Sequence, residues 1–184
     1  MLYNIEYVVI FALQGGFLME IEKSCCITGR RKIPLACQEH VLHLLKKKVQ
    51  EALCDGFRCF LSGFADGADL YFAKLVAEKK EEYPDIQLVA AIPYRQRLNK
   101  LQQDPEILKI LNEDWCHIKV CNESYHRGVF AKRNRYLVEH TQRVIAVYDD
   151  IPSGGTYSTI QMAEKLNRDI HYIPFSAETD STPQ

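Results

Sequence analysis

The 184-residue chain has almost no net charge and no long hydrophobic run. Its 23 Lys and Arg nearly balance 24 Asp and Glu, which gives a net charge of −1. Binding to a polynucleotide needs a surplus of cations against phosphates, so this balance argues against a nucleic-acid partner. The apolar run at 7–13 is far shorter than the about 20 residues of a membrane-spanning helix, and it lacks signal-peptide flanks. These absences predict no membrane partner, but they leave room for a small anionic ligand.

The chain also lacks the cysteine patterns of disulfide frameworks and zinc sites. Its 7 cysteines are odd in number, and none forms a C-x-x-C pair. Cys37, His40 and His43 follow one another at i+3 steps on a predicted helix, so they do not converge on one metal, and no metal site is expected. We therefore predict reduced thiols in a cytoplasmic protein. Cys25 and Cys26 lie next to each other in an apolar run, where a strand would point them to opposite faces.

Three common enzyme motifs are missing as well. The sequence contains no G-x-G-x-x-G, no G-x-x-x-x-G-K-[ST] and no G-x-S-x-G. It therefore has neither a dinucleotide fingerprint, nor a Walker P-loop, nor the nucleophile elbow of α/β-hydrolases. The remaining composition, 47% hydrophobic and 26% charged, is ordinary for a folded globular domain.

What the sequence does contain is a regular alternation of apolar strands and amphipathic helices. The predicted strands cover 24–28, 58–62, 86–92, 115–120, 143–148 and 170–173. The predicted helices cover 35–54, 66–82, 96–112, 129–141 and 156–167, the third being interrupted near Asp104 and Pro105. Strict alternation of this kind predicts a Rossmann-like three-layer α/β/α fold, with a mostly parallel sheet of about six strands.

The chain is expected to form a single domain over 19–175. Residues 1–18 are interpreted as an N-terminal extension, with Met19 as the more natural start; the alternative is an extra strand or short helix packed on the domain. Residues 176–184 are polar and are expected to form a C-terminal tail.

Glycines, small hydroxyls and arginines gather after the predicted strands. The segments are Thr28-Gly29-Arg30-Arg31, 62–69 and Ser153-Gly154-Gly155-Thr156. Ligands of open parallel sheets bind outside the carboxyl ends of the strands. Glycines there allow close approach of a ligand to the backbone, and the N–H groups of a helix start favour an anion. The alternative is structural: Asp66, Asp69, Ser153 or Thr156 would cap helices, and the arginines would be surface charges.

Five ordered motifs together resemble the SLOG superfamily. This superfamily groups the Rossmann-like domain of DNA-processing protein A with the "lonely guy" cytokinin-activating phosphoribohydrolases. Segment 62–69 (SGFADGAD) is similar to the S-G-x-A-x-G-x-D signature of the former, and 152–156 (PSGGT) to the P-G-G-x-G-T loop of the latter. With the further motifs at 27–31, 91–94 and 132–134, the pattern most resembles the small YpsA-like family of unknown function.

The resemblance implies a protein that binds a nucleotide or nucleotide-derived ligand at the two glycine loops, as a sensor or regulator. Where the phosphoribohydrolases carry a catalytic glutamate, this chain has Thr159, which cannot supply the negative charge. One alternative is an N-glycosidic hydrolase in which Asp66, Asp69, Asp149 or Asp150 replaces that glutamate. Another is a nucleic-acid binder that uses Arg127, Lys132, Arg133 and Arg135. The oligomeric state stays open, a homo-oligomer included.

The expected ligand site draws on all these segments. Its candidate residues are Thr28, Gly29, Arg30, Arg31, Ser62, Gly63, Asp66, Asp69, Arg133, Asn134, Ser153, Gly154, Gly155 and Thr156. The glycines and hydroxyls would cradle a phosphate, the arginines would neutralise it, and Asp66 or Asp69 would hold a ribose hydroxyl or cap the helix.

Overall fold

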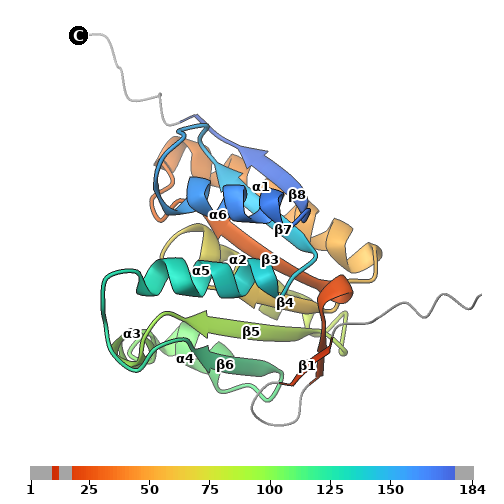
Figure 1. Ribbon diagram of the computed structural model, residues 1–184. Helices are drawn as coiled ribbons and strands as arrows, with labels where there is room; N and C mark the ends of the chain where they lie inside the picture. Colours follow the sequence, from red (N-terminus) through yellow and green to blue (C-terminus); the bar gives the residue numbers. More distant parts are fainter. Residues whose placement is uncertain (1–9, 13–17, 177–184) are drawn as a thin grey trace, which may run out of the picture.

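The centre of the molecule is a six-stranded, fully parallel sheet with the strand order β6-β5-β4-β3-β7-β8 (Figure 1). The computed structural model describes residues 10–12 and 18–176. The sheet strands are β3 (Ser24–Gly29), β4 (Cys59–Ser62), β5 (Gln87–Ile92), β6 (Cys116–Val120), β7 (Arg143–Tyr148) and β8 (Asp169–Pro174). The predicted Rossmann-like three-layer α/β/α fold is confirmed.

Helices cover both faces of the sheet (Figure 1). One face carries α1 (Leu35–Cys54), α2 (Ala68–Lys79), α3 (Arg95–Leu101) and α4 (Pro105–Leu111), and the other carries α5 (Val129–Glu139) and α6 (Gly154–Lys165). The chain first runs outward from β3 to β6 and then returns to place β7 beside β3. A right-handed crossover places its helix on one face when the next strand is added toward β6 and on the other face when it is added toward β8. The reversal therefore puts α5 and α6 on the face opposite the other helices.

The alternation of strand side chains divides the core into two layers. Cys25 and Ile27 pack under α1 and α2, whereas Cys26 faces α5 and α6 with Leu61 and Val144. The prediction that Cys25 and Cys26 point to opposite faces is therefore correct. All strand residues of β7 are buried, as expected for a strand covered on both sides.

The helix boundaries follow local chemistry. The predicted interruption occurs at Asp104, whose carboxylate accepts hydrogen bonds from the N–H groups of Glu106 and Ile107 at 3.0 and 3.2 Å, and Pro105 opens the next helix. Helix α2 begins later than predicted, at Ala68, because Gly67 adopts φ +81°, outside the helical region.

Of the N-terminal residues, Ile10–Ala12 (β1) and Leu18–Glu20 (β2) pair antiparallel in a small separate sheet. A short 3₁₀ helix, Ile21–Lys23, then leads into β3. The rest of the predicted extension, 1–9 and 13–17, lies outside the described residues, as does 177–184 of the predicted tail.

All 7 cysteines are free thiols. Burial raises the pKa of Cys26, Cys59 and Cys116 to about 12 and that of Cys25 well above its usual value. Cys37 and Cys121 are half-buried, and Cys54 is exposed. Among the described residues, no helix has the length and apolar character needed to cross a bilayer.

We expect N-ethylmaleimide at pH 8 to modify Cys54 first and Cys37 next, because only an accessible thiolate reacts. The four buried thiols should stay unmodified until the protein is unfolded in urea. Intact-mass spectrometry counts the adducts. More than three adducts on the folded protein would show that at least one of the four buried thiols is accessible to solvent.

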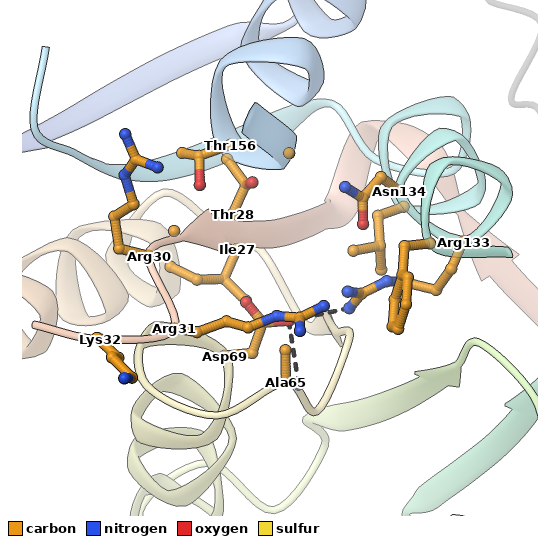
Figure 2. Close-up of a pocket in the computed structure, with 14 residues that line it drawn as sticks. Ile27, Thr28, Arg30, Arg31, Lys32, Ala65, Asp69, Arg133, Asn134 and Thr156 are labelled. Carbon is orange, nitrogen blue, oxygen red and sulfur yellow. Dashed lines mark hydrogen bonds and ion pairs between the residues drawn. The ribbon is translucent and has the colours of Figure 1, made fainter. Parts of the chain in front are cut away.

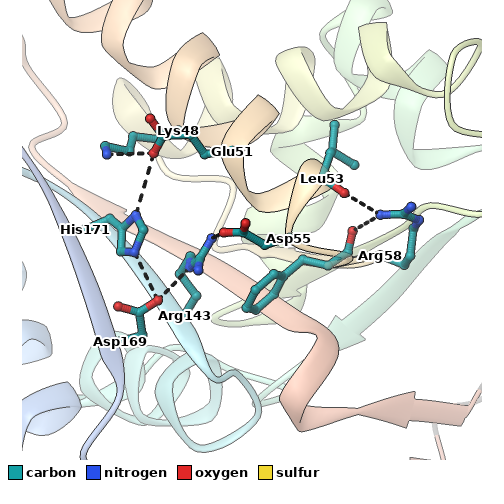
Figure 3. Close-up of polar contacts among 9 residues, drawn as sticks. Lys48, Glu51, Leu53, Asp55, Arg58, Arg143, Asp169 and His171 are labelled. Carbon is teal, nitrogen blue, oxygen red and sulfur yellow. Dashed lines mark hydrogen bonds and ion pairs between the residues drawn. The ribbon is translucent and has the colours of Figure 1, made fainter.

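The amino ends of the strands are joined by a polar network around Arg143 (Figure 3). Its Nη1 donates to Asp55 at 2.7 Å and its Nε to Asp169 at 2.8 Å, while the guanidinium lies 4.4 Å above the Phe57 ring. His171 Nε2 is 3.0 Å from the same Asp169 carboxylate. The network ties the end of α1 to β7 and β8.

Candidate functional site

A pocket of about 400 Å³ opens at the carboxyl end of β3, where the strand order reverses between β3 and β7 (Figure 2). Such a reversal is where Rossmann-like sheets bind ligands. The loop after β3, the segment from β4 to α2, one face of α5 and the first turn of α6 form its walls. The lining residues are Ile27, Thr28, Gly29, Arg30, Arg31, Lys32, Ala65, Asp69, Phe130, Arg133, Asn134, Leu137, Gly155 and Thr156.

A buried ion pair forms one wall of the pocket. Arg133 Nη1 donates to Asp69 Oδ2 at 2.9 Å, and both side chains are only 6% exposed. Burial raises the pKa of Asp69, against the lowering effect of Arg133 and of the Ala65 N–H, which donates to the same oxygen. Arg133 Nε is buried and has no hydrogen-bond partner among the described residues. The guanidinium is thus fixed at one end and unsatisfied at the other.

Gly63 makes room for this ion pair. A Cβ at this position would overlap the Arg133 guanidinium and would lie 2.6 Å from Asp69 Oδ2. Gly29 has a similar role, because a Cβ there would lie 2.5 Å from Ala68 Cβ. Both glycines allow the close approach of α2 and α5 to the strand ends, so they shape the pocket through packing.

The first turn of α6 borders the pocket through Gly155 and Thr156. The first N–H groups of a helix have no acceptor within it, and they attract anions. Gly154, at φ +83°, starts the turn, and Thr156 lies beside Thr28 with its hydroxyl toward the pocket (Figure 2). Both threonines are almost fully buried. This turn offers hydroxyl and amide donors to the same small volume.

Arg30 stands on the other side of this turn from Arg133 (Figure 2). Its Nε forms an ion pair with Asp149, 2.7 Å from Oδ2. Its Nη2 is buried without a hydrogen-bond partner among the described residues. Two arginines with unused donors therefore flank the helix start.

Nine of the fourteen residues expected at the ligand site line this pocket: Thr28, Gly29, Arg30, Arg31, Asp69, Arg133, Asn134, Gly155 and Thr156. The other five, Ser62, Gly63, Asp66, Ser153 and Gly154, do not. Ser62 is buried and donates its hydroxyl to the Asp69 carbonyl at 2.8 Å.

The alternative that side chains of these residues cap α2 and α6 is wrong, because neither helix has a side-chain capping hydrogen bond. Gly67, not Asp66, is the N-cap of α2, and no side chain caps this helix. Asp66 is instead paired with Arg97 at 2.9 Å on the surface. Ser153 occupies the N-cap position of α6, yet its side chain makes no capping hydrogen bond. Asp69 is held by Arg133, because tertiary contact outweighs the local capping pattern.

Thr159, at the place of the phosphoribohydrolase glutamate, has a structural role. Its buried hydroxyl donates to the Gly155 carbonyl at 2.7 Å and accepts from Asn134 Nδ2 at 2.9 Å. It therefore orients Asn134 at the pocket wall. Of the carboxylates named as substitutes for the glutamate, Asp66, Asp69 and Asp149 are all ion-paired with arginines.

Phe130 and Leu137 also line the pocket, although neither is among the residues predicted from the sequence. Both lie on α5 with Arg133 and Asn134, at positions 130, 133, 134 and 137 of one helix face. This i, i+3, i+4, i+7 spacing places Phe130 and Leu137 on the same helix face as Arg133, so both can be predicted once Arg133 is assigned to the site. Lys32 was also missed, although it directly follows Arg31.

A model of the YpsA family, described as the YspA SLOG family, matches residues 26–177. The chain belongs to this family. Among curated proteins it is similar to UPF0398 proteins, at 25% identity over 138 residues in Ligilactobacillus salivarius (strain UCC118), covering 73% of this chain and 75% of that protein. The Bacillus pumilus (strain SAFR-032) relative is 28% identical over 152 residues, with 77% and 82% covered.

The YpsA-family fold also resembles a solved structure of DNA processing protein A from Helicobacter pylori. The TM-score is 0.57 at 18% identity, and the match covers 84% of this chain and 66% of that one. That structure is described as giving insight into the unique single-stranded DNA binding mode of its protein. At this identity the likeness establishes a common fold.

Proposed function

We propose that this YpsA-family protein binds a nucleotide or nucleotide-derived ligand, with a phosphate at the first turn of α6. The observation that carries the proposal is Arg133, a lining residue of the pocket whose buried Nε has no hydrogen-bond partner among the described residues. A buried donor left unsatisfied is costly, and an anion in the pocket would satisfy it. Arg30 offers one more such donor, its Nη2, from the opposite side, while its Nε is paired with Asp149.

The charge around the pocket supports an anionic ligand. Four cations line it, namely Arg30, Arg31, Lys32 and Arg133, and only Asp69 among the lining residues is acidic. Among the described residues, neither Arg31 nor Lys32 forms an ion pair with a carboxylate. The overall net charge of −1 therefore conceals a local excess of positive charge.

Binding without hydrolysis fits this pocket better than cleavage of a glycosidic bond. The pocket carboxylate, Asp69, is bonded to Arg133, and Thr159 carries no charge. A carboxylate that stabilises an oxocarbenium-like state has to face the substrate. We therefore propose a sensor or regulator.

Nucleotide binding is tested by thermal shift and calorimetry with AMP, a cyclic nucleotide, NAD and ADP-ribose. At a concentration 100 times its dissociation constant, a ligand should stabilise the fold by about 2.7 kcal/mol.

Thr156→Val keeps the shape of the side chain but removes the hydroxyl, and we expect about 3- to 10-fold weaker binding.

Arg135→Gln is the matched control, because Arg135 is exposed on α5 and lies outside the pocket. It should bind like the unaltered protein. The absence of any shift with all four ligands at millimolar concentration would refute the proposed function.

A further inference from the structure

Three aromatic rings form a cluster beside the pocket, which we call the aromatic triad. Tyr94 precedes α3, Tyr125 lies in the loop between β6 and α5, and Phe130 belongs to α5. The Tyr94 and Tyr125 ring centroids are 5.4 Å apart, and Phe130 lies 6.2 and 6.5 Å from them, all in edge-to-face arrangements. Three segments that are distant in the sequence thus present rings at one place.

The triad is continuous with the pocket. Phe130 lines the pocket and contacts both tyrosines. Arg31, another lining residue, places its guanidinium carbon 4.7 Å from the centre of the Phe130 ring. A ligand whose phosphate lies at α6 can therefore reach the triad along Arg31 and Phe130.

The outermost ring of the triad is open to solvent and is held in place. Tyr125 is 63% exposed, which is unusual for a side chain of this size. Its loop is fixed by Asn122, which donates to the Pro93 carbonyl at 2.9 Å and accepts from Lys132 Nζ at 3.0 Å. The ring is thus preformed, with a lysine beside the same loop.

Charges at this surface favour a polyanion. Arg31 and Lys132 form no ion pair with a carboxylate among the described residues, whereas the nearby acids Glu123 and Asp66 are paired with Arg95 and Arg97. Aromatic rings that are flanked by cations stack the bases of single strands, because every base has a π-face and its backbone is anionic.

We propose that the aromatic triad stacks a base of a single-stranded nucleic acid, while a neighbouring phosphate of the same strand occupies the pocket. This inference rests on the proposed phosphate site and extends it to a longer ligand. A strand fits better than a free nucleotide, because small-ligand sites bury most of their ligand whereas Tyr125 lies open. The fold shared with a DNA processing protein is consistent with this occupant.

The test measures fluorescence anisotropy of a labelled four-nucleotide oligothymidylate on the full chain at 50 mM salt. We expect it to bind more tightly than the mononucleotide and than a blunt duplex. Tyr125→Ala should weaken strand binding about 5- to 150-fold, whereas Tyr125→Phe should keep it. Tyr172→Ala, which removes an exposed tyrosine from β8, is the matched control and should change nothing.

Three outcomes separate the inference from the proposed function. If the mononucleotide binds but Tyr125→Ala leaves strand affinity unchanged, the triad proposal is wrong and the phosphate site stands. If the strand binds no more tightly than the mononucleotide, the occupant is at most a single nucleotide and the strand proposal is overturned. If neither ligand binds, the proposed function fails as well. Urea unfolding of each variant confirms that it is folded.

Discussion

Replacing Arg133 with methionine is expected to lower the free energy of unfolding by about 3–5 kcal/mol. The substitution leaves Asp69 as a buried carboxylate whose remaining hydrogen bond among the described residues comes from the Ala65 N–H, at 3.3 Å. Removing one partner of a buried ion pair costs this much because the remaining charge is kept from water. Ligand binding should be lost at the same time, because the guanidinium is the central cation of the proposed phosphate site.

A second substitution separates these two effects. The double substitution Arg133→Met, Asp69→Asn removes the unpaired charge and keeps an acceptor for the Ala65 N–H. Its free energy of unfolding should therefore return to within about 2 kcal/mol of the original value. Binding should not return. Urea unfolding, followed by the fluorescence of the single tryptophan, Trp115, measures both variants. A loss below about 1 kcal/mol for Arg133→Met would show that the pair is not buried as described.

Replacing Arg143, at the edge of the sheet opposite the pocket, with methionine should lower the free energy of unfolding by about 2 kcal/mol. Arg143 is 10% exposed and bonds two carboxylates, at 2.7 and 2.8 Å, from the segments on either side of β7 (Figure 3). Asp55 and Asp169 are half-exposed, so water can replace part of the lost contact. The cost is therefore expected to be smaller than at Arg133.

Arg95→Met is the control for this prediction. Its ion pair with Glu123 spans 3.2 Å, and the two side chains are 48% and 81% exposed. An exposed pair of this kind contributes less than about 1 kcal/mol. If both substitutions lowered the urea midpoint equally, the Arg143 network would have no special role in joining α1, β7 and β8. The nucleotide affinity of Arg143→Met should remain unchanged, since the network lies at the far ends of the strands.

Much of the pocket could be predicted because its residues directly follow strands. Arg30, Arg31 and Thr156 can be predicted from their residue types and from their positions after strands, since all strands of a parallel sheet end at one edge. Asp66 was misassigned by the same reasoning, because position after a strand does not determine which way a side chain points. Its carboxylate faces Arg97 at the surface, whereas Asp69, on the first turn of α2, turns inward.

The α/β fold, its six parallel strands and the edge at which small and basic residues collect can all be predicted from the amino-acid sequence. These properties follow from local periodicity and from the handedness of the crossovers, both of which are readable along the chain. The buried pair of Asp69 and Arg133 over Gly63 joins residues 64 positions apart and is visible in the folded structure alone. The tertiary structure also brings Tyr94, Tyr125 and Phe130 together. Contacts of this kind depend on how helices dock on the sheet, and no spacing in the sequence encodes that geometry.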